Sequence, residues 1–319
     1  MRVDLIVPCY NEEQVLPLFW EEASKVTSEI PGYEFGFLFV DDGSRDRTLP
    51  ILRSLAAEHP EVSYLSFSRN FGKEAAMYAA LSHTRADYAV ILDADLQHPP
   101  ILIKDMLQAM EEGYDCCIAI RSRKGDPKLR TWFSRRFYKL MNRISDVELK
   151  DGAGDFRMMN RKMINAVLSL QEVSRFSKGI FSFVGFNCKE IYYENVERAA
   201  GSSKWNFFKL FRYAFDGITA FSTYPLRLVA FLGGSLSFAA LLYLIVLLIK
   251  TAVTGIDVPG YTSTVSLILI FGGAILLCLG IIGEYLAKIY TEIKHRPVYL
   301  IGESHLADEQ TDSLEARED

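Results

Sequence analysis

Apolar and polar positions alternate in a regular way over the first part of the chain. Across residues 1–120, short apolar runs rich in β-branched and aromatic residues alternate with segments in which apolar residues recur every three or four positions. Such runs predict strands, and such segments predict amphipathic helices. Strands are expected at residues 4–8, 35–40, 62–66, 88–92 and 115–120, and helices at 13–28, 46–58, 73–82 and 101–111. This alternation predicts an α/β fold, a mostly parallel sheet with helices on both faces.

Two long apolar runs lie nearer the C-terminus. Residues 228–249 and 264–283 contain no charged side chain. About 20 residues of helix span about 30 Å, the thickness of the hydrocarbon layer of a bilayer. The runs therefore predict a two-helix transmembrane hairpin. The alternative is a pair of helices buried in a protein core.

The segment before the hairpin, residues 201–227, combines aromatic and cationic residues. Phe208, Phe211 and Phe215 recur at helical spacing, and Arg212 falls on another side of the same helix. Such an amphipathic helix suits a membrane interface. An ordinary core-facing helix is the alternative.

Charges on either side of the hairpin predict its orientation. Arg227 precedes the first apolar run, and Lys288, Lys294 and Arg296 follow the second. The residues between the two runs carry only one Lys and one Asp. Because Lys and Arg are enriched on the cytoplasmic side of membrane helices, both termini and the α/β domain are expected in the cytoplasm.

These patterns divide the chain into a cytoplasmic α/β domain at residues 1–200, a juxtamembrane helix at 201–227, the hairpin at 228–287 and a cytoplasmic C-terminal segment at 288–319. Residues 302–319 include seven acids and one Arg, so this tail is expected to be disordered. A formal net charge of −5 does not favour a nucleic-acid partner. The five cysteines form no Cys-x-x-Cys pair, which argues against a zinc site and indicates a reducing compartment.

Polar and acidic residues follow each of the first four expected strands. The motifs are PCYNEE at residues 8–13, VDDGSRDRT at 40–48, SRNFGKE at 68–74 and DADLQHPP at 93–100. The carboxyl ends of parallel strands meet at one edge of a sheet, where ligands bind. No Gly-x-Gly-x-x-Gly follows the first strand and no phosphate-loop motif occurs, which argues against a dinucleotide-binding or phosphate-loop domain.

The acidic pair after the fourth strand suggests a metal site. Asp93 and Asp95 directly follow an apolar run. Two carboxylates with oxygen-rich neighbours suit a hard divalent cation, Mg²⁺ or Mn²⁺. For His98 we expect packing inside the loop, with metal ligation as the alternative. For Gly72 and Lys73 we expect a structural role, as a turn and a helix start.

Five motifs, taken together and in order, resemble a known family. VPCYNEE, VDDGSRDRT, SRNFGKEAA, DADLQHPP and GDFRMMNR are similar to the motifs of family 2 inverting glycosyltransferases. The likeness is strongest to the polyisoprenyl-phosphate glycosyltransferases, which include dolichol-phosphate mannosyltransferase and the bactoprenol glucosyltransferases with two C-terminal membrane helices. The resemblance runs from about residue 3 to about residue 300. It implies a GT-A fold that binds a nucleotide-sugar.

The resemblance also implies a reaction. One sugar, glucose from UDP-glucose, would be transferred with inversion to polyprenyl (undecaprenyl) phosphate on the cytoplasmic face of a bacterial inner membrane, with Mg²⁺ or Mn²⁺ as cofactor and a homotetramer as the assembly. The expected partners are the nucleotide-sugar, the lipid phosphate and the bilayer. A mannose synthase that uses GDP-mannose and a membrane adaptor with an inactive transferase domain are the alternatives. A processive polysaccharide synthase is disfavoured because the chain lacks a Gln-x-x-Arg-Trp signature.

The resemblance carries site residues over motif by motif. Those implied for the nucleotide-sugar are Pro8, Tyr10, Glu12, Asp41, Asp93 and Gln97, and those for the phosphate groups and the acceptor are Arg121, Arg157, Arg198, Ser203 and Lys204. Asp93 and Asp95 would bind the metal, and Asp95 and Asp155 are the catalytic candidates. Because a lipid monophosphate is largely a dianion near pH 7, a strong base is less necessary, and Asp155 is expected to act either as base or as orienter of the acceptor.

A basic segment, residues 128–143, interleaves Lys and Arg with aromatic residues. We expect it to lie on the anionic leaflet and admit the lipid headgroup. A solvated helix with no ligand is the alternative.

Overall fold

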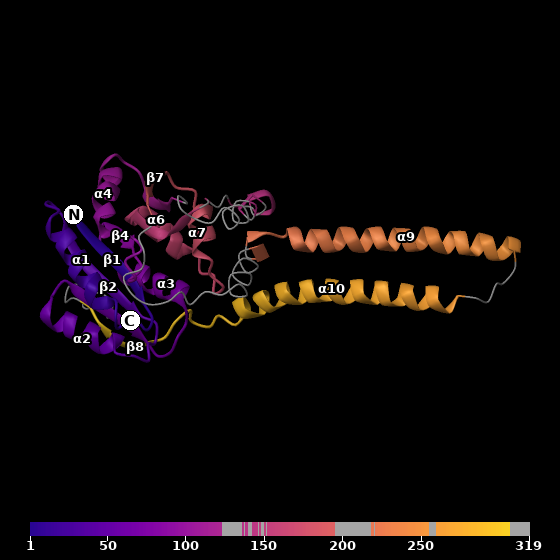
Figure 1. Ribbon diagram of the computed structural model, residues 1–319, viewed down its shortest axis with the longest axis horizontal. Coiled ribbons are helices and arrows are strands. Elements are labelled where there is room, and N and C mark those ends of the chain that lie inside the picture. The colour runs from indigo at the N-terminus through magenta and orange to yellow at the C-terminus, as the bar shows by residue number, and fades with distance from the viewer. Residues whose placement is uncertain are drawn as a thin grey trace.

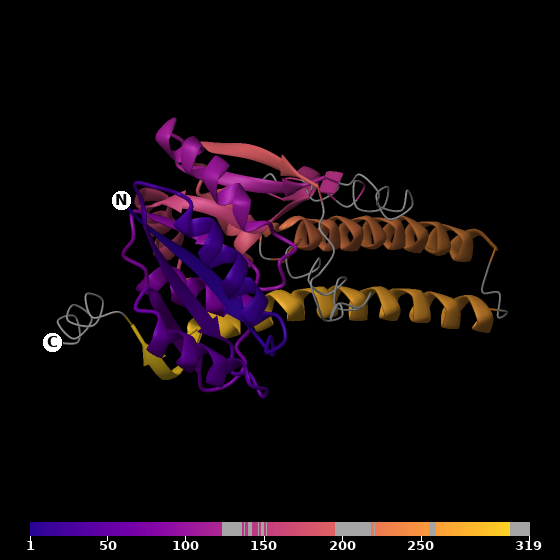
Figure 2. The same cartoon turned by 60° about the vertical axis from the view of Figure 1, so that its left-hand side comes forward.

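The computed structural model describes residues 1–122, 136, 138–139, 142–145, 147, 150, 152–194, 218–219, 221–254 and 260–306. It consists of an α/β domain and two long helices that leave this domain side by side (Figures 1 and 2). The elements, in chain order, are β1 (Arg2–Cys9), α1 (Leu16–Ser28), β2 (Glu34–Asp41), α2 (Thr48–Glu58), β3 (Val62–Phe67), α3 (Lys73–His83), β4 (Tyr88–Ile91), η1 (Pro100–Leu102), α4 (Ile103–Glu111), β5 (Cys116–Arg121), β6 (Ala153–Asn160), α6 (Arg161–Ser169), α7 (Ser177–Phe183), β7 (Cys188–Tyr193), α9 (Tyr224–Thr254), α10 (Tyr261–Ile293) and β8 (Ile301–His305).

The sheet has the strand order β7-β5-β6-β4-β1-β2-β3-β8. Strands β4, β1, β2 and β3 run parallel, which confirms the prediction of a mostly parallel sheet. Strand β6 is antiparallel to both of its neighbours, β4 and β5, and β8 is antiparallel to β3. From β1 the chain continues to β2 on one side, and β4 lies on the other. This change of direction opens a crevice at the carboxyl ends of the parallel strands.

Alternating side chains of the strands build two separate cores, one on each face of the sheet. Leu5 and Val7 pack with α1, α2 and α4, whereas Ile6 between them packs with α3, α6 and α7. This follows from the two-residue period of a strand. All three side chains are completely buried, and each such burial contributes roughly 1.5–3 kcal/mol. The helices therefore cover both faces, and the crevice edge stays free for polar loops.

The last described strand corrects the prediction of a disordered tail from residue 302. Residues Ile301–His305 form β8, which pairs with the open edge of β3. Glu303 accepts hydrogen bonds from Arg53 Nε at 2.8 Å and from Tyr64 Oη at 2.6 Å. The charge composition indicated a solvated tail. Composition does not reveal that the edge strand β3 offers backbone N–H and C=O groups, with which β8 forms hydrogen bonds. The sheet is therefore not confined to residues 1–200, and residues 307–319 lie outside the described part.

Helices α9 and α10 form the predicted hairpin and are longer than the two apolar runs. Their segments Tyr224–Val246 and Ile270–Ile293 have mean hydropathies of 2.2 and 2.0, and none of the residues in the most apolar windows is buried. Both helices are thus long and apolar enough to cross a membrane, and the alternative of buried core helices is wrong. Helix α9 begins three residues before the expected boundary at 227. Most of residues 201–227 lies outside the described part of the chain.

The hairpin is tied to the α/β domain at both of its ends. The Glu292 carboxylate in α10 accepts hydrogen bonds from the backbone N–H groups of Val173 and Ser174, at 3.1 and 3.0 Å. At the other end, a Cβ added to Gly179 in α7 would lie 2.3 Å from the ring of Phe221, so only glycine permits this contact. Because the chain after α10 returns to the sheet as β8, both ends of the hairpin are attached to the same domain (Figure 1).

Candidate active site

The acidic loop after β4 emerges at the crevice, as predicted. The Leu92 N–H still bonds to the carbonyl of Ile6, and Asp93 follows with 30% of its side chain exposed. Asp95 Oδ1 accepts the N–H of Gln97 at 3.1 Å. Leu96 between them has a φ of +57°, which is rare for a branched side chain and costs of order 1–3 kcal/mol. The fold therefore holds this loop in a strained conformation that keeps both carboxylates at the edge of the sheet.

Lys73 lies between two carboxylates, one on the loop after β4 and one in β6. Its Nζ is 2.6 Å from Asp93 Oδ1 and 2.7 Å from Asp155 Oδ2. Burial alone would lower the pKa of Lys73. The negative charges of Asp155 and Asp93 outweigh this effect and raise the pKa. Burial would likewise raise the pKa of Asp155, but Lys73 and then Lys178 hold that pKa well below its usual range. The three side chains form a charged cluster at the centre of the candidate site.

The position of Lys73 is set by a buried carboxylate on the neighbouring loop. Asp42, 4% exposed, accepts the backbone N–H groups of Phe71 and Gly72 at 2.6 and 2.9 Å and the side-chain amide of Asn70 at 2.8 Å. Gly72 has a φ of +98° and immediately precedes α3, so Lys73 is the first residue of the helix. The motifs VDDGS and SRNFGKE are thus one structural unit that places an ammonium group in the crevice.

This position of the Lys73 ammonium was not predicted from the sequence. The expected turn at Gly72 and helix start at Lys73 are both present, but the side chain also reaches Asp93 and Asp155. The contact depends on β6, which lies next to β4, pairs Ile91 with Arg157 and brings Asp155 close to the acidic loop. An antiparallel strand supplied by residues 153–160 cannot be placed from the periodicity of residues 1–120.

His98 packs inside the loop, as expected for it. Its ring stacks on Phe156 with a centroid distance of 5.1 Å and meets Tyr193 edge-on at 6.1 Å. Burial lowers the pKa of His98, so the neutral imidazole is favoured. Its Nδ1 is 3.8 Å from Asp93 Oδ2, which is too long for a hydrogen bond.

The residues predicted to hold the nucleotide-sugar lie at the carboxyl ends of β1 and β2 and on the loops after β1 and β4. The loops after β1 and β2 are joined by hydrogen bonds from the Asn11 N–H to Ser44 Oγ and from the Glu12 N–H to Thr48 Oγ1, both at 2.9 Å. Asp41 is 1% exposed; its two oxygens accept the N–H of Ser44 and the hydroxyl of Ser66. Asp41 therefore shapes the loop from inside, and its predicted contact to a nucleoside stays a prediction. The half-buried members of the set are Pro8, Tyr10, Glu12, Asp93 and Gln97.

The residues predicted for the acceptor are only partly described. Arg157 lies two positions after Asp155 on the same face of β6 and is 4% exposed. Its guanidinium stacks 3.8 Å above the ring of Phe181, and its Nη2 donates to the carbonyl of Gly154 at 2.9 Å. Arg121 ends β5. Arg198, Ser203 and Lys204 lie outside the described residues, as does most of the basic segment 128–143.

A metal ion fits the donor atoms of the acidic loop only with help from a ligand. The described part of the chain contains no group of three or more His, Cys, Asp or Glu side chains arranged to hold a metal. Asp93 and Asp95 supply two carboxylates, which is the number that Mg²⁺ commonly takes from a protein when diphosphate oxygens complete its shell. Asp93 already holds a cation, the ammonium of Lys73, which shows that this position favours positive charge.

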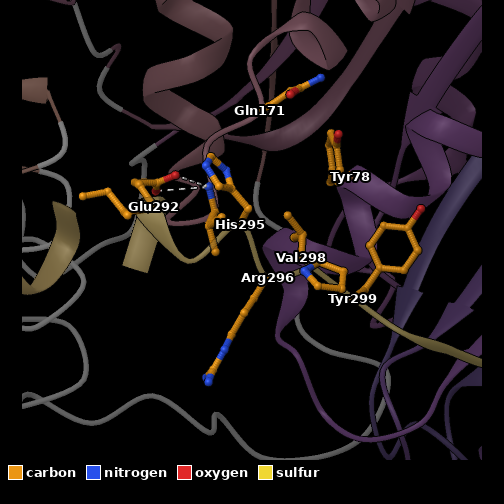
Figure 3. A pocket seen from close by; sticks show the side chains of 10 residues that line it. Tyr78, Gln171, Glu292, His295, Arg296, Val298 and Tyr299 are labelled. Carbon is orange, nitrogen blue, oxygen red and sulfur yellow. Dashed lines mark hydrogen bonds between the residues drawn. The ribbon is translucent and has the colours of Figure 1, made fainter. Parts of the chain in front are cut away.

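A cavity that is separate from the predicted site residues lies at the end of α10. It has a volume of about 720 Å³ and is lined by Tyr78, Glu292, Arg296 and their neighbours, but by none of the predicted site residues. Figure 3 shows the Glu292 carboxylate engaged by hydrogen bonds and Arg296 directed away from the other labelled side chains. The charged cluster around Lys73 contains predicted site residues, and this cavity does not.

Comparison with known proteins agrees with the arrangement of both parts. The family described as "Glycosyl transferase family 2" matches residues 4–168, and the "GtrB C-terminal hairpin" matches residues 224–289. The chain is 45% identical over 304 residues to "Putative glycosyltransferase CsbB" of Bacillus subtilis (strain 168), which covers 95% of this chain and 92% of that protein. It is 40% identical over 306 residues to "Bactoprenol glucosyl transferase" of Shigella phage SfII, which covers 96% of this chain and 99% of that protein.

Among solved structures, the chain is similar to glucosyl-3-phosphoglycerate synthase from Mycobacterium tuberculosis in complex with Mn²⁺ and UDP-glucose. The TM-score is 0.45 with 16% identity, over 68% of this chain and 77% of that one. The sequence matches to the family and to nearly full-length relatives bear out the resemblance of the five motifs. The chain therefore belongs to the family 2 glycosyltransferases and carries the GtrB C-terminal hairpin.

Proposed function

We propose that the protein transfers a single glucose from UDP-glucose to polyprenyl (undecaprenyl) phosphate, with inversion, at the cytoplasmic face of the membrane. The product is polyprenyl-phosphate-glucose. Relatives named bactoprenol glucosyl transferase, about 40% identical over nearly the whole chain, support the acceptor class and the sugar. The single observation that carries the proposal is the Asp93–Lys73–Asp155 cluster in the crevice of a domain joined to an apolar hairpin.

The donor side of the site is the crevice edge formed by the loops after β1, β2 and β4. Its loops would position the nucleotide through Pro8, Tyr10, Glu12, Asp41 and Gln97. Asp93 and Asp95 would hold Mg²⁺ or Mn²⁺, which supplies a Lewis acid that stabilises the charge of the departing diphosphate. The two carboxylates are held by their own loop and by their neighbours before any substrate arrives, so little reorganisation is required at the moment of reaction.

The role of Asp155 follows from its surroundings. Because Lys73 and Lys178 hold the pKa of Asp155 well below its usual range, this carboxylate is a poor proton acceptor near neutral pH. A phosphate monoester needs little help from a base, since its second pKa is about 6. Of the two roles left open by the sequence, orienting the acceptor is the better supported. An acceptor that attacks opposite the leaving diphosphate inverts the anomeric centre.

A cavity beside Arg157 suits the acceptor headgroup. It has a volume of about 320 Å³ and is lined by Lys150, Arg157 and Lys178 together with Phe181 and Phe186. Cations beside aromatic rings match a phosphate followed by an isoprene chain. Lys150 and Lys178 were not among the residues predicted from the motifs.

The cavity lies close to the start of the hairpin. Helix α7, which contributes Lys178 and Phe181 to the cavity, packs against Phe221, three residues before α9. A lipid that leaves the bilayer beside α9 would therefore reach the cavity by a short path. The cations that flank the hairpin support a cytoplasmic location of the α/β domain and of both termini. Glycines on α9 and α10 permit close helix contacts, and a homotetramer stays a prediction.

The experiment is a panel of donors. Purified protein in lipid nanodiscs is incubated with undecaprenyl phosphate, Mg²⁺ or Mn²⁺, and one radiolabelled nucleotide-sugar at a time. The proposal expects label in the chloroform phase with UDP-glucose. Label from GDP-mannose alone would identify a mannose synthase, and no transfer from any donor would indicate an inactive adaptor. Either outcome contradicts the proposal.

A further inference from the structure

We propose that Lys73 is the resident counter-cation of the metal position, and that its ammonium leaves Asp93 when a divalent cation binds there while it keeps its contact with Asp155. This inference rests on the proposed function, because it concerns the same site. It adds a positioning residue that couples the arrival of the donor to the acceptor side. Neither the motifs nor the relatives' names assign Lys73 this role.

The geometry of the charged cluster leads to this proposal. One ammonium is 2.6 Å from Asp93 and 2.7 Å from Asp155, so it pairs with two carboxylates at once. A divalent cation bound to Asp93 would place a second positive charge beside the same carboxylate. Like charges at such short range repel strongly, and the divalent ion attracts the carboxylate more than an ammonium does. The two cations therefore compete for Asp93, and the ammonium, which has Asp155 as a second partner, is the one that leaves.

The side chain of Lys73 is suited to such a movement. Its backbone is fixed at the start of α3 by the hydrogen bonds of Asp42 to Phe71 and Gly72. Its side chain is 40% exposed, and lysine carries its charge on a flexible four-carbon stem with three N–H donors. The ammonium can therefore leave one carboxylate without disturbing the loop that holds the residue.

Asp155 provides a second anchor on which the ammonium can remain. Its Oδ2 accepts the Lys73 ammonium, whereas its buried Oδ1 has no hydrogen-bond partner among the described residues. An ammonium released from Asp93 has at least one N–H group free to point at an incoming phosphate oxygen. Metal binding at Asp93 would thus prepare a phosphate contact beside Asp155. The site would bind metal weakly until a diphosphate contributes its own oxygen ligands.

The test measures Mn²⁺ binding to the full-length protein by electron paramagnetic resonance, without nucleotide. Lys73→Met removes the competing charge, so we expect Mn²⁺ to bind at least about tenfold more tightly than to the wild type. Lys73→Arg keeps a cation and is expected to stay within about twofold. Lys178→Met is the matched control, since Lys178 acts on Asp155 but is not paired with Asp93; it should change Mn²⁺ affinity by less than about threefold.

A second measurement adds UDP. In the wild type, UDP is expected to strengthen Mn²⁺ binding more than it does in Lys73→Met, because the variant has no ammonium left to displace. Equal or weaker Mn²⁺ binding in Lys73→Met, or equal enhancement by UDP in both proteins, would overturn the inference. If the variant does not fold, as judged by thermal unfolding, Lys73→Gln is used with the same expectations.

The measurement remains readable if the proposed function fails. Mn²⁺ binding requires neither a sugar donor nor a lipid acceptor. Tighter binding in Lys73→Met together with no transfer to undecaprenyl phosphate would refute the proposed function and leave this inference standing. Transfer of the sugar to lipid, together with an unchanged Mn²⁺ affinity in Lys73→Met, would support the proposed function and refute this inference.

Discussion

The crevice edge of the sheet and the α9–α10 hairpin are built in contrasting ways. At the edge, Asp42, Lys73, Asp93 and Asp155 come from four separate parts of the chain and depend on one another through ion pairs and hydrogen bonds. In the hairpin, the described residues of the most apolar windows are not buried by the domain. The ability of the hairpin to cross a membrane therefore depends on its apolar composition, and single substitutions change this little. The charged cluster at the edge depends on the exact positions of its side chains, and single substitutions disrupt it.

The largest effect, a loss of sugar transfer, is expected for a substitution of Asp155. Asp155→Asn removes a charge that pairs with Lys73, so the ammonium loses its second anchor and the acceptor loses its orienting carboxylate. We expect kcat for sugar transfer to fall about 10²-fold or more. The matched control is Asp115→Asn at the opposite end of β5 and β6, where the carboxylate pairs with Asn160 and Lys162. A loss of less than threefold in Asp155→Asn would contradict the role given to it.

The next effect concerns the support of the site. Asp42→Ala leaves the half-buried N–H groups of Phe71 and Gly72 without their acceptor. Each such group costs about 1–3 kcal/mol, so the free energy of unfolding of the domain should fall by about 2–4 kcal/mol. Denaturant unfolding of the protein in detergent measures this. A change below about 0.5 kcal/mol would show that the loop is held by other contacts.

A smaller effect is expected at the seam between the two regions. Glu292→Gln weakens the charge-assisted hydrogen bonds to the N–H groups of Val173 and Ser174. Hydrogen exchange at these two amides should become about fivefold faster, which corresponds to roughly 1 kcal/mol of local opening free energy. Glu284→Gln on the same helix is the control and should leave both amides unchanged. Equal exchange in all three proteins would mean that Glu292 does not dock the hairpin.

The smallest effect is expected at the exposed edge of the sheet. Arg53 and Tyr64 lower the pKa of Glu303 to about 2. A depressed pKa means that the pair stabilises β8 above the ordinary glutamate pKa of about 4.3, and that this contribution is lost as pH falls from there towards about 2. The difference in unfolding midpoint between wild type and Glu303→Gln should therefore shrink over this pH range and also with added salt. If the difference in unfolding midpoint grew as the pH fell, the ion pair would not be the source of the stabilisation.

The sequence predicted the parts of the molecule that depend on local pattern. The five strands and four helices of residues 1–120 and the apolar hairpin were all expected close to their observed positions. Their signals are periodicity and composition, which operate within a short window. Asp93 and Asp95 could be placed at the crevice for the same reason, because the end of a parallel strand has a fixed position in a sheet of this kind.

The remainder depends on contacts between distant segments. Strand β6 enters the sheet antiparallel between β4 and β5, and only then does Asp155 meet Lys73. Strand β8 comes from a segment whose charges indicated disorder, because its pairing with β3 is invisible in composition. Lys150 and Lys178 meet Arg157 in one cavity although no motif joins them. None of these distances can be inferred from spacing along a single chain.

The central claim is that the acidic edge moves a sugar onto a lipid phosphate beside the bilayer. The most direct test compares wild type with Asp95→Asn in nanodiscs, with radiolabelled UDP-glucose and with or without undecaprenyl phosphate. The account predicts chloroform-soluble label only when lipid phosphate is present, and a rate at least about 100-fold lower in the variant. Full activity of Asp95→Asn, or release of nucleotide at the same rate without the lipid phosphate, would contradict it.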